Sequence, residues 1–303
     1  MNRSGRHRFR LLVLVVSPKR NLEIGMNGLR DPSEAMVRKF RRTVRERYRS
    51  NGRDLPWRRT KSPYAVLVSE VMLQQTQVER VLPRYTAFLR AFPSFSALSR
   101  ASLHDVLTMW NGLGYNRRAS SLRAIAQEVM QVWKGRLPDD PELLRTLPAI
   151  GPCTAAAVCV FAFGKRLPFL ETNIRTVYLH HFFGPCQKVP DSLVIELVQR
   201  TLPRVKIREW YYALMDYGSC LKRGGVRTGE RSASYRRQSP FGGSRREIRG
   251  AILRMLTRRD TISIRDVVSA FPGRSGQVHE AFAALESEGL IAKHGAGWHI
   301  NRG

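Results

Sequence analysis

The stretch Pro32–Lys222 combines helix-period hydrophobic patterning with frequent helix breakers, and this combination most constrains the fold. Apolar residues recur at helical spacing, as at Met36, Phe40 and Val44, while polar and basic residues fill the other faces. Proline and glycine interrupt the pattern at short intervals, which suits roughly ten short helices. No period-2 run of any length appears here. The sequence therefore predicts an all-α core over residues 31–222.

Two segments flank this core with different composition. Residues 1–30 predict a disordered N-terminal extension, and their apolar run Leu11–Val16 is too short for a secretory core or a membrane span. Residues 1–25 are either such a tail or the product of an over-called start codon. Residues 223–246 mix glycine with arginine and have little apolar content. They predict a basic loop laid over the core or along a phosphate backbone.

Residues 247–303 show three helical patterns followed by a hairpin pattern. Ser263 and Ser275 are expected to cap the second and third helices, and two short apolar runs flank His294-Gly295-Ala296. Three helices and a hairpin are typical of a winged helix-turn-helix module, whose third helix reads DNA. A packing module that touches no DNA is the alternative, because the third helix carries acidic and neutral side chains rather than a basic face.

Charge points to a polyanionic partner. The 303 residues include 52 Lys and Arg against 24 Asp and Glu, a net charge of +28. Nucleic acid is the usual partner of such a field, and a solvated basic surface is the alternative. The four cysteines are widely spaced and form no CxxC pair, so neither a metal site nor a disulfide framework is indicated. We expect a reduced, cytoplasmic protein without a membrane segment.

Residues 63–78, PYAVLVSEVMLQQTQV, place a lone carboxylate in an otherwise apolar helix. Burial among its apolar neighbours is expected to raise the pKa of Glu70, because burial disfavours the charged form. Two amides, Gln74 and Gln75, follow at once. The alternative is a buried glutamate that pairs with an arginine.

Two further motifs carry candidate contacts. In residues 147–155, LPAIGPCTA, a short helix ends, a tight turn follows and an alanine-rich helix begins. Free N–H groups at the start of that helix can hold a phosphate, and we expect Gly151 to permit the close turn. An ordinary helical corner is the alternative. In residues 168–177, PFLETNIRTV, Glu171 follows an apolar lead-in and Asn173 stands two positions later. A glutamate that only caps a helix is the alternative there.

Together these segments resemble the catalytic core of the MutY-like A/G-specific adenine glycosylases, which belong to the helix-hairpin-helix (HhH-GPD) DNA glycosylase superfamily. The resemblance covers residues 33–222, and it includes the stretch GLGYNRRA at 112–119 and Leu-Pro-Trp-Arg at 55–58. It implies a helix-hairpin-helix core that cleaves the bond between a base and its sugar. The partner would be double-stranded DNA with a mismatched or damaged base.

The resemblance also implies a role for each matching residue. Glu70 would protonate the flipped base. Glu171 would stabilise the cationic transition state or trap it covalently, with Asn173 holding Glu171 or water in place. Gln74 and Gln75 would enter the duplex and fill the gap left by the base. The base pocket would include Trp57, Arg58, Cys153 and Tyr212, although Trp57 as plain core is an alternative. Further DNA contacts would come from Tyr115, Asn116, Leu147, Ile150, Gly151, Cys153 and Thr154.

The chain departs from the family pattern at single positions. Glu171 replaces an aspartate, Ala149 stands where the family prefers glycine, and Asn116 replaces a tyrosine that wedges into DNA. Tyr212 stands where a glutamine or glutamate faces the adenine. Cys153 occupies the position of the Schiff-base lysine of some relatives, which predicts a monofunctional glycosylase without efficient lyase activity.

Other departures concern whole segments. Only Cys220 follows the stretch Met215–Gly218, where the family has a four-cysteine loop, so we expect no iron–sulfur cluster and no other cofactor. The resemblance still allows a monovalent cation at the hairpin carbonyls. We expect the winged module in place of a Nudix-like C-terminal domain.

The favoured interpretation is a monomeric, nucleoid-associated glycosylase that hydrolyses the bond to adenine opposite guanine or 8-oxoguanine. A thymine or uracil mismatch glycosylase is the alternative within the same enzyme class. A non-catalytic protein that binds DNA lesions is the alternative from another class, and retention of Glu70 argues against it. A nucleoid protein that binds through charge alone would need none of these pocket residues.

Overall fold

The computed structural model describes residues 32–236, 240–295 and 297–301. The expected extension at 1–30 and the hairpin residue Ala296 lie outside these described residues. The α-helices of the first part are α1 (Glu34–Asn51), α2 (Pro63–Leu73), α3 (Val78–Ala91), α4 (Phe95–Arg100), α5 (Leu103–Trp110), α6 (Arg117–Val132), α7 (Pro141–Thr146), α8 (Pro152–Phe163), α9 (Thr172–Phe182), α10 (Asp191–Thr201) and α11 (Ile207–Arg223). The second part has α12 (Arg245–Leu256), α13 (Ile264–Ala270), α14 (Ser275–Ser287), β1 (Ile291–His294) and β2 (Gly297–Ile300). Two short 3₁₀ helices, η1 (Pro56–Arg58) and η2 (Thr228–Arg231), complete the set.

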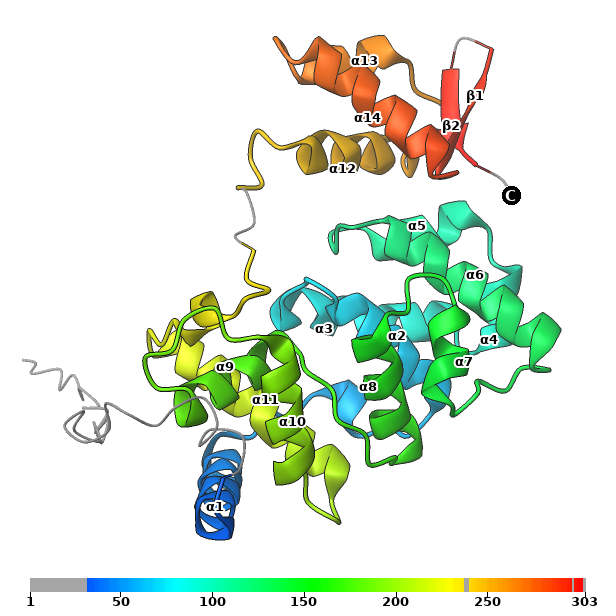
Figure 1. Ribbon diagram of the computed structural model, residues 1–303. Helices are drawn as coiled ribbons and strands as arrows, with labels where there is room; N and C mark the ends of the chain where they lie inside the picture. The colour runs from blue at the N-terminus through cyan, green and yellow to red at the C-terminus, as the bar shows by residue number, and fades with distance from the viewer. Residues whose placement is uncertain (1–31, 237–239, 296, 302–303) are drawn as a thin grey trace, which may run out of the picture.

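The all-α core is confirmed, and its helices gather around two apolar clusters. One cluster includes residues of the helices from α2 through α8. The other includes residues of α1, α9, α10 and α11 (Figure 1). Helix α8 contributes to both clusters, since Val158 packs in the first and Val160 in the second. A helix that is apolar on all sides is buried on all sides. The N-terminus of α8 therefore lies at the boundary between the two halves of the core.

Helix α1 follows its predicted stripe only in part. Phe40 and Val44 are buried, and α1 packs against α11. Met36 is 52% exposed, because it lies in the first turn of the helix.

The arginine- and glycine-rich segment 223–246 is laid over the core for part of its length. The hydroxyl of Thr228, in η2, donates to the carbonyl of Thr176 in α9 at 3.1 Å. A backbone hydrogen bond adds to this contact: the N–H of Ala233 donates to the carbonyl of Val189 at 2.9 Å. These polar contacts fasten the segment to α9 and to the loop that precedes α10.

The C-terminal part has the three helices and hairpin expected of a winged helix-turn-helix module. Strands β1 and β2 pair antiparallel, and an isolated bridge joins Ile262 to Trp298. Ser263 caps α13 in a capping box with Asp266, as predicted. The expected cap at Ser275 is wrong: Ser275 is the first helical residue of α14, and Arg274 precedes it without a side-chain cap.

This module lies beside α5 and the loop that follows it (Figure 1). The Asn111 side-chain amide donates to the Thr257 hydroxyl at 3.0 Å. The Arg246 guanidinium donates to the Tyr115 hydroxyl at 3.2 Å. Both contacts involve the loop between α5 and α6, so the module holds the stretch that contains Tyr115.

Candidate active site

Glu70 lies on the last full turn of α2, in an apolar setting. The helix is capped by the Ser62 hydroxyl, which accepts from the N–H of Ala65, and Pro63 occupies its first turn. The residues before and after Glu70 are buried, whereas Glu70 itself stays partly exposed. Burial, and next the charge of Glu171, raise the pKa of Glu70 to about 8. A carboxyl group with that pKa is mostly protonated at neutral pH.

Glu171 caps α9 and is held by three N–H donors. Its Oε1 accepts from the backbone N–H groups of Asn173 at 2.9 Å and Ile174 at 2.8 Å. Its Oε2 accepts from the Asn173 side-chain amide at 3.2 Å. Burial raises the pKa of Glu171, and these backbone N–H groups together with Lys222 and Arg175 act in the opposite direction. The helix cap is real, and it also fixes the carboxylate that Glu171 presents beside Glu70.

Cys153 joins these two carboxyl groups from a third element. It stands in the first turn of α8, and its thiol contacts the carbonyl of Leu170 at 3.4 Å. Burial of the thiol, with the charges of Glu171 and Glu70, raises the pKa of Cys153 to about 12, although the residue as a whole is exposed. The thiol is therefore neutral and a poor nucleophile at physiological pH. Residues far apart in sequence thus converge at the boundary between the two halves of the core.

An aromatic stack lies next to Glu70. The Tyr212 ring stacks on Phe161 at 4.7 Å, and the Arg58 guanidinium lies over the Tyr212 ring at 4.6 Å. Burial raises the pKa of Tyr212, and the Glu70 charge adds to this shift. Trp57, by contrast, is 5% exposed and packs edge-on against Tyr85, as expected of a residue that forms part of the core.

Asp216 anchors this stack, and sequence reasoning did not assign it a role. Two parallel hydrogen bonds of 2.8 Å join the Arg58 guanidinium to its two oxygens. Arg53 adds one from its backbone N–H at 2.8 Å and one from its Nε at 2.6 Å. The buried carboxylate fixes the plane of Arg58 over Tyr212. The only sequence signal was the position of Asp216 in the stretch Met215–Gly218.

The two amides after α2 lie differently. Gln74 donates to the hydroxyl of Thr154 at 3.1 Å, so it ties the end of α2 to the hairpin. Gln75 is exposed and has a left-handed backbone, with φ 53°. Of the two side chains, that of Gln75 is the more exposed.

Arg118 fixes this turn, and sequence reasoning missed it. Its guanidinium, 7% exposed, donates to the carbonyls of Val71, Met72 and Gln74 at 2.6–2.9 Å. It also donates to the carbonyl of Gly114 at 3.0 Å. These bonds hold the α2 turn beside the loop that contains Tyr115. An arginine in an amphipathic helix gives no sequence signal for such a role.

The hairpin turn has a left-handed residue at an unexpected place. Ala149 has φ 62°, whereas Gly151 has φ −87° and no atom within 4 Å of the position a side chain would take. The prediction that Gly151 permits the close turn is therefore wrong, because the strained conformation belongs to Ala149. The side chains of Leu147 and Ile150 are buried in the core, and the N–H of Ile150 donates to the carbonyl of Leu147 at 3.2 Å within the turn.

Tyr115 and Asn116 lie on the neighbouring loop. Tyr115 is 38% exposed with φ 48°, and Asn116 precedes α6 at its N-terminus without a side-chain cap. The loop that contains both residues lies beside the turn after α2, because Arg118 donates to the carbonyls of Gln74 and Gly114.

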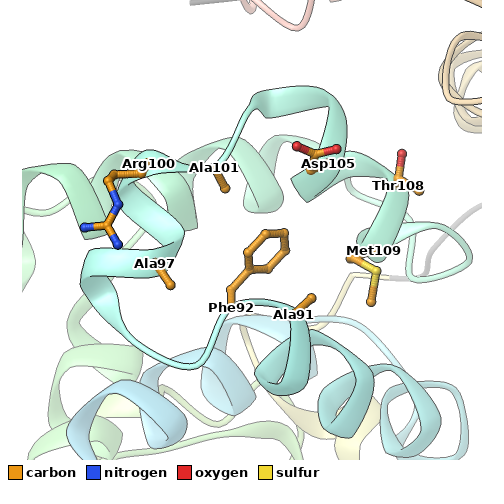
Figure 2. A pocket seen from close by; sticks show the side chains of 8 residues that line it. All are labelled: Ala91, Phe92, Ala97, Arg100, Ala101, Asp105, Thr108 and Met109. Carbon is orange, nitrogen blue, oxygen red and sulfur yellow. The ribbon is translucent and has the colours of Figure 1, made fainter.

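One cavity lies away from these residues. It measures about 420 Å³ and lies between α3, α4 and α5, with Phe92 at its floor and Arg100 and Asp105 at its rim (Figure 2). It contains none of the predicted site residues. Within the described ranges, no group of three or more histidine, cysteine or acidic side chains is placed to hold a metal ion. No described helix has the length and apolar character needed to cross a membrane.

The sequence of residues 68–202 matches the model of the HhH-GPD superfamily of base excision DNA repair proteins. Similar proteins include the adenine DNA glycosylase of Mycobacterium tuberculosis, 40% identical over 57% of this chain and 58% of that protein. The adenine DNA glycosylase of Mycolicibacterium smegmatis is 36% identical over 67% of this chain and 75% of that protein. The chain spans less than two thirds of the first of these relatives.

Solved structures give the same fold. A thermostable thymine-DNA glycosylase superposes with a TM-score of 0.57 and 27% identity, over 62% of this chain and 88% of that one. An endonuclease III trapped as a covalent intermediate with DNA superposes with a TM-score of 0.50 and 17% identity, over 70% of this chain and 92% of that one. Both superpositions show that this chain shares the fold of these proteins.

Proposed function

The chain belongs to the HhH-GPD superfamily of base excision DNA repair proteins, and from this premise we propose that it is a monofunctional DNA glycosylase. Its substrate would be a flipped adenine opposite guanine or 8-oxoguanine in double-stranded DNA. The observation that carries the proposal is the pair of carboxyl groups, Glu70 and Glu171, in unlike surroundings. Glu171 accepts three N–H hydrogen bonds, whereas Glu70 has no hydrogen-bond partner among the described residues.

This difference supports different chemical roles for the two carboxyl groups. N–H donors favour the charged form of a carboxyl group, so a pair that shares one proton keeps that proton on Glu70. Glu70 then donates the proton to the base, and the glycosidic bond breaks with its electron pair on the base. Glu171 stabilises the cationic sugar that remains, electrostatically or through a covalent intermediate. Water then adds to the sugar and loses a proton to the Glu70 carboxylate, which restores the acid and leaves an abasic site.

The surroundings of the pair support the remaining steps. Gln75, exposed at the end of α2, would fill the gap left by the flipped base, while Gln74 holds the turn to Thr154. The stacked ring of Tyr212 under Arg58 would form one wall for the base. The neutral Cys153 thiol supports hydrolysis rather than lyase chemistry, because it is neither an amine nor a thiolate.

Adenine is favoured by the similar proteins named adenine DNA glycosylase, at 36–40% identity. A thymine or uracil mismatch is the second candidate, since the thermostable thymine-DNA glycosylase shares the fold at 27% identity. The net charge of +28 supports double-stranded DNA as the partner. We also propose a cytoplasmic monomer that acts on nucleoid DNA and needs neither an iron–sulfur cluster nor another cofactor.

The test is single-turnover cleavage of duplexes that carry A:8-oxoG, A:G, T:G or U:G, followed by alkali to break the strand at abasic sites. We expect breaks in the adenine duplexes with wild type, and none with Glu70→Gln or Glu171→Gln. Glu196→Gln is the matched control, because Glu196 is an exposed glutamate of α10. Breaks in the T:G or U:G duplex alone would favour the second candidate. Mismatch binding without breaks in any duplex would instead favour a lesion-binding protein.

A further inference from the structure

Helix α11 approaches the start of α9 unusually closely. A side chain at Gly218 would place its first carbon 2.1 Å from the carbonyl oxygen of Asn173, a distance that no real contact reaches. The glycine therefore permits backbone contact between α11 and the residue that holds Glu171. One helical turn further along α11, on the same face, stands Lys222.

Lys222 reaches the same asparagine through its side chain. Its Nζ donates to the Asn173 side-chain oxygen at 2.9 Å. Lysine is only a donor, so this bond assigns the oxygen of the Asn173 amide to Lys222 and leaves the NH₂ group for Glu171. That NH₂ group donates to Glu171 Oε2 at 3.2 Å. The three side chains thus form a chain of hydrogen bonds from Lys222 through Asn173 to Glu171. Every donor in this chain has an acceptor only when Glu171 is a carboxylate.

We propose that Lys222 is a positioning residue for the glycosylase reaction, which orients Asn173 and holds Glu171 in its charged form. The proposal deepens the function proposed above and rests on it. Lys222 would touch neither the base nor the sugar; it acts through Asn173.

Other charged groups around Glu171 do not fill this role. The titratable or charged groups that face Glu171 are Glu70 on α2, Cys153 on α8, Arg175 on α9 and Lys222 on α11. The guanidinium of Arg175 is engaged with Asp191, in two bonds of 2.8 and 2.6 Å. Glu70 and Cys153 disfavour the charge on Glu171 when they ionise. Lys222 is therefore the cation that both acts on Glu171 and contacts Asn173.

Lys222 is exposed as a residue, and its pKa still responds to the protein around it. Burial lowers the pKa of Lys222, and the charge of Glu171 acts against that change. Conversely, the ammonium group works against the burial that raises the pKa of Glu171. Loss of the ammonium group would shift Glu171 towards its protonated form and weaken stabilisation of a cationic sugar.

The direct test is a ¹³C NMR titration of the Glu171 side-chain carboxyl in the full-length protein without DNA, with the signal assigned by its loss in Glu171→Gln. We expect the apparent pKa to rise in Lys222→Met and to stay near the wild-type value in Lys222→Arg. Arg223→Met is the matched control, since it removes one positive charge from the same exposed turn of α11. An unchanged Glu171 titration in folded Lys222→Met would overturn the proposal.

Single-turnover excision against pH gives the second measurement. The acid limb should move to higher pH in Lys222→Met, with a rate loss of about tenfold below the limb for each unit of pKa shift. A loss that is equal at every pH would mean a merely structural role and would contradict the proposal. If wild type excises no base at all, the proposed function fails, yet the NMR titration still decides the role of Lys222. If Lys222→Met does not fold, the comparison of Lys222→Gln with Lys222→Arg replaces it in both measurements.

Discussion

Glu70 and Glu171 are the same type of residue, and their surroundings make them chemically different. Glu171 faces the N–H groups at the start of a helix, whereas Glu70 faces apolar side chains and the charge of Glu171. The two carboxyl groups lie close together, so a negative charge on one disfavours a negative charge on the other. An acid and an anion side by side are what protonation of a leaving base and stabilisation of a cationic sugar require.

Glu70 should also leave a signature in stability. Its folded pKa of about 8 lies above the value near 4.5 of an exposed glutamate. Between these two pH values the unfolded chain has released the proton and the folded protein has not, so the free energy of unfolding falls as pH rises. We expect the free energy of unfolding of Glu70→Gln, relative to that of wild type, to rise by up to about 1.4 kcal/mol per pH unit across this window.

The measurement is urea unfolding of Glu70→Gln and wild type at pH 5 and pH 8, with Glu196→Gln as the control. The free energy of unfolding of Glu70→Gln should exceed that of wild type by more at pH 8 than at pH 5. That of Glu196→Gln should change with pH as wild type does. A gap that is the same at both values would show that Glu70 is not held in its protonated form.

The hairpin turn gives a residue-scale prediction with a built-in control. Ala149 has φ 62°, a region that glycine occupies more readily, so Ala149→Gly should stabilise the protein by about 0.5–1 kcal/mol. Gly151→Ala should leave the stability nearly unchanged, because its backbone is extended and the space beside it is open. It should nevertheless weaken DNA binding if a phosphate approaches the N-terminus of α8. Thermal unfolding and duplex titrations of both variants check these outcomes. A Gly151→Ala protein that binds DNA as wild type does would rule out the phosphate contact.

At the scale of elements, the site is built from helix ends. Glu70 and the Gln75 turn come from the end of α2, Cys153 from the start of α8 and Glu171 from the start of α9. Helix ends offer free N–H and carbonyl groups, which Glu171 and Arg118 use. The packing of α9 on α11 then sets where these ends meet.

Gly218 is the position where that packing is least tolerant. A methyl group there would meet the Asn173 backbone, so Gly218→Ala should destabilise the protein by about 3 kcal/mol or more and displace the Glu171 cap. Gly276→Ala in α14 is the control, since nothing lies within 4 Å of the added carbon there. Chemical denaturation of both variants decides the matter, and a Gly218→Ala protein as stable as Gly276→Ala would show that the helices are not in such close contact.

The sequence predicts the helices and the two carboxyl groups better than it predicts the contacts that hold them in place. Glu70 stands out because an apolar helix with one carboxylate is unusual, and Glu171 stands out by its place before a helix. The partners of Arg118 and Asp216 lie up to 47 and 163 residues away, and no local pattern shows such contacts. The left-handed turn was assigned to Gly151 rather than Ala149, because glycine is the usual residue there and the backbone angle is not written in the sequence.

At the scale of the whole molecule, charge and shape make separable contributions to DNA binding. A net charge of +28 favours any duplex, and such binding weakens steeply as salt rises, because the counterions that binding releases gain less entropy in concentrated salt. Contacts to a flipped base add specificity that salt affects less.

We therefore expect affinity for a matched duplex to fall by orders of magnitude between low and physiological salt, while preference for the A:8-oxoG duplex persists or grows. Fluorescence anisotropy with the catalytically inactive Glu70→Gln protein measures both, with a matched duplex of equal length as the control. A preference that disappears as salt rises would indicate binding through charge alone.

The most direct test of the acid and anion pair is the single-turnover excision rate of wild type as a function of pH. The account predicts a rate that falls on the alkaline side as Glu70 loses its proton, near pH 8, and on the acid side as Glu171 gains one. The exposed control Glu196→Gln should show the same alkaline fall as wild type. A wild-type rate that stays level or increases through pH 9 would contradict the assignment of Glu70 as the proton donor.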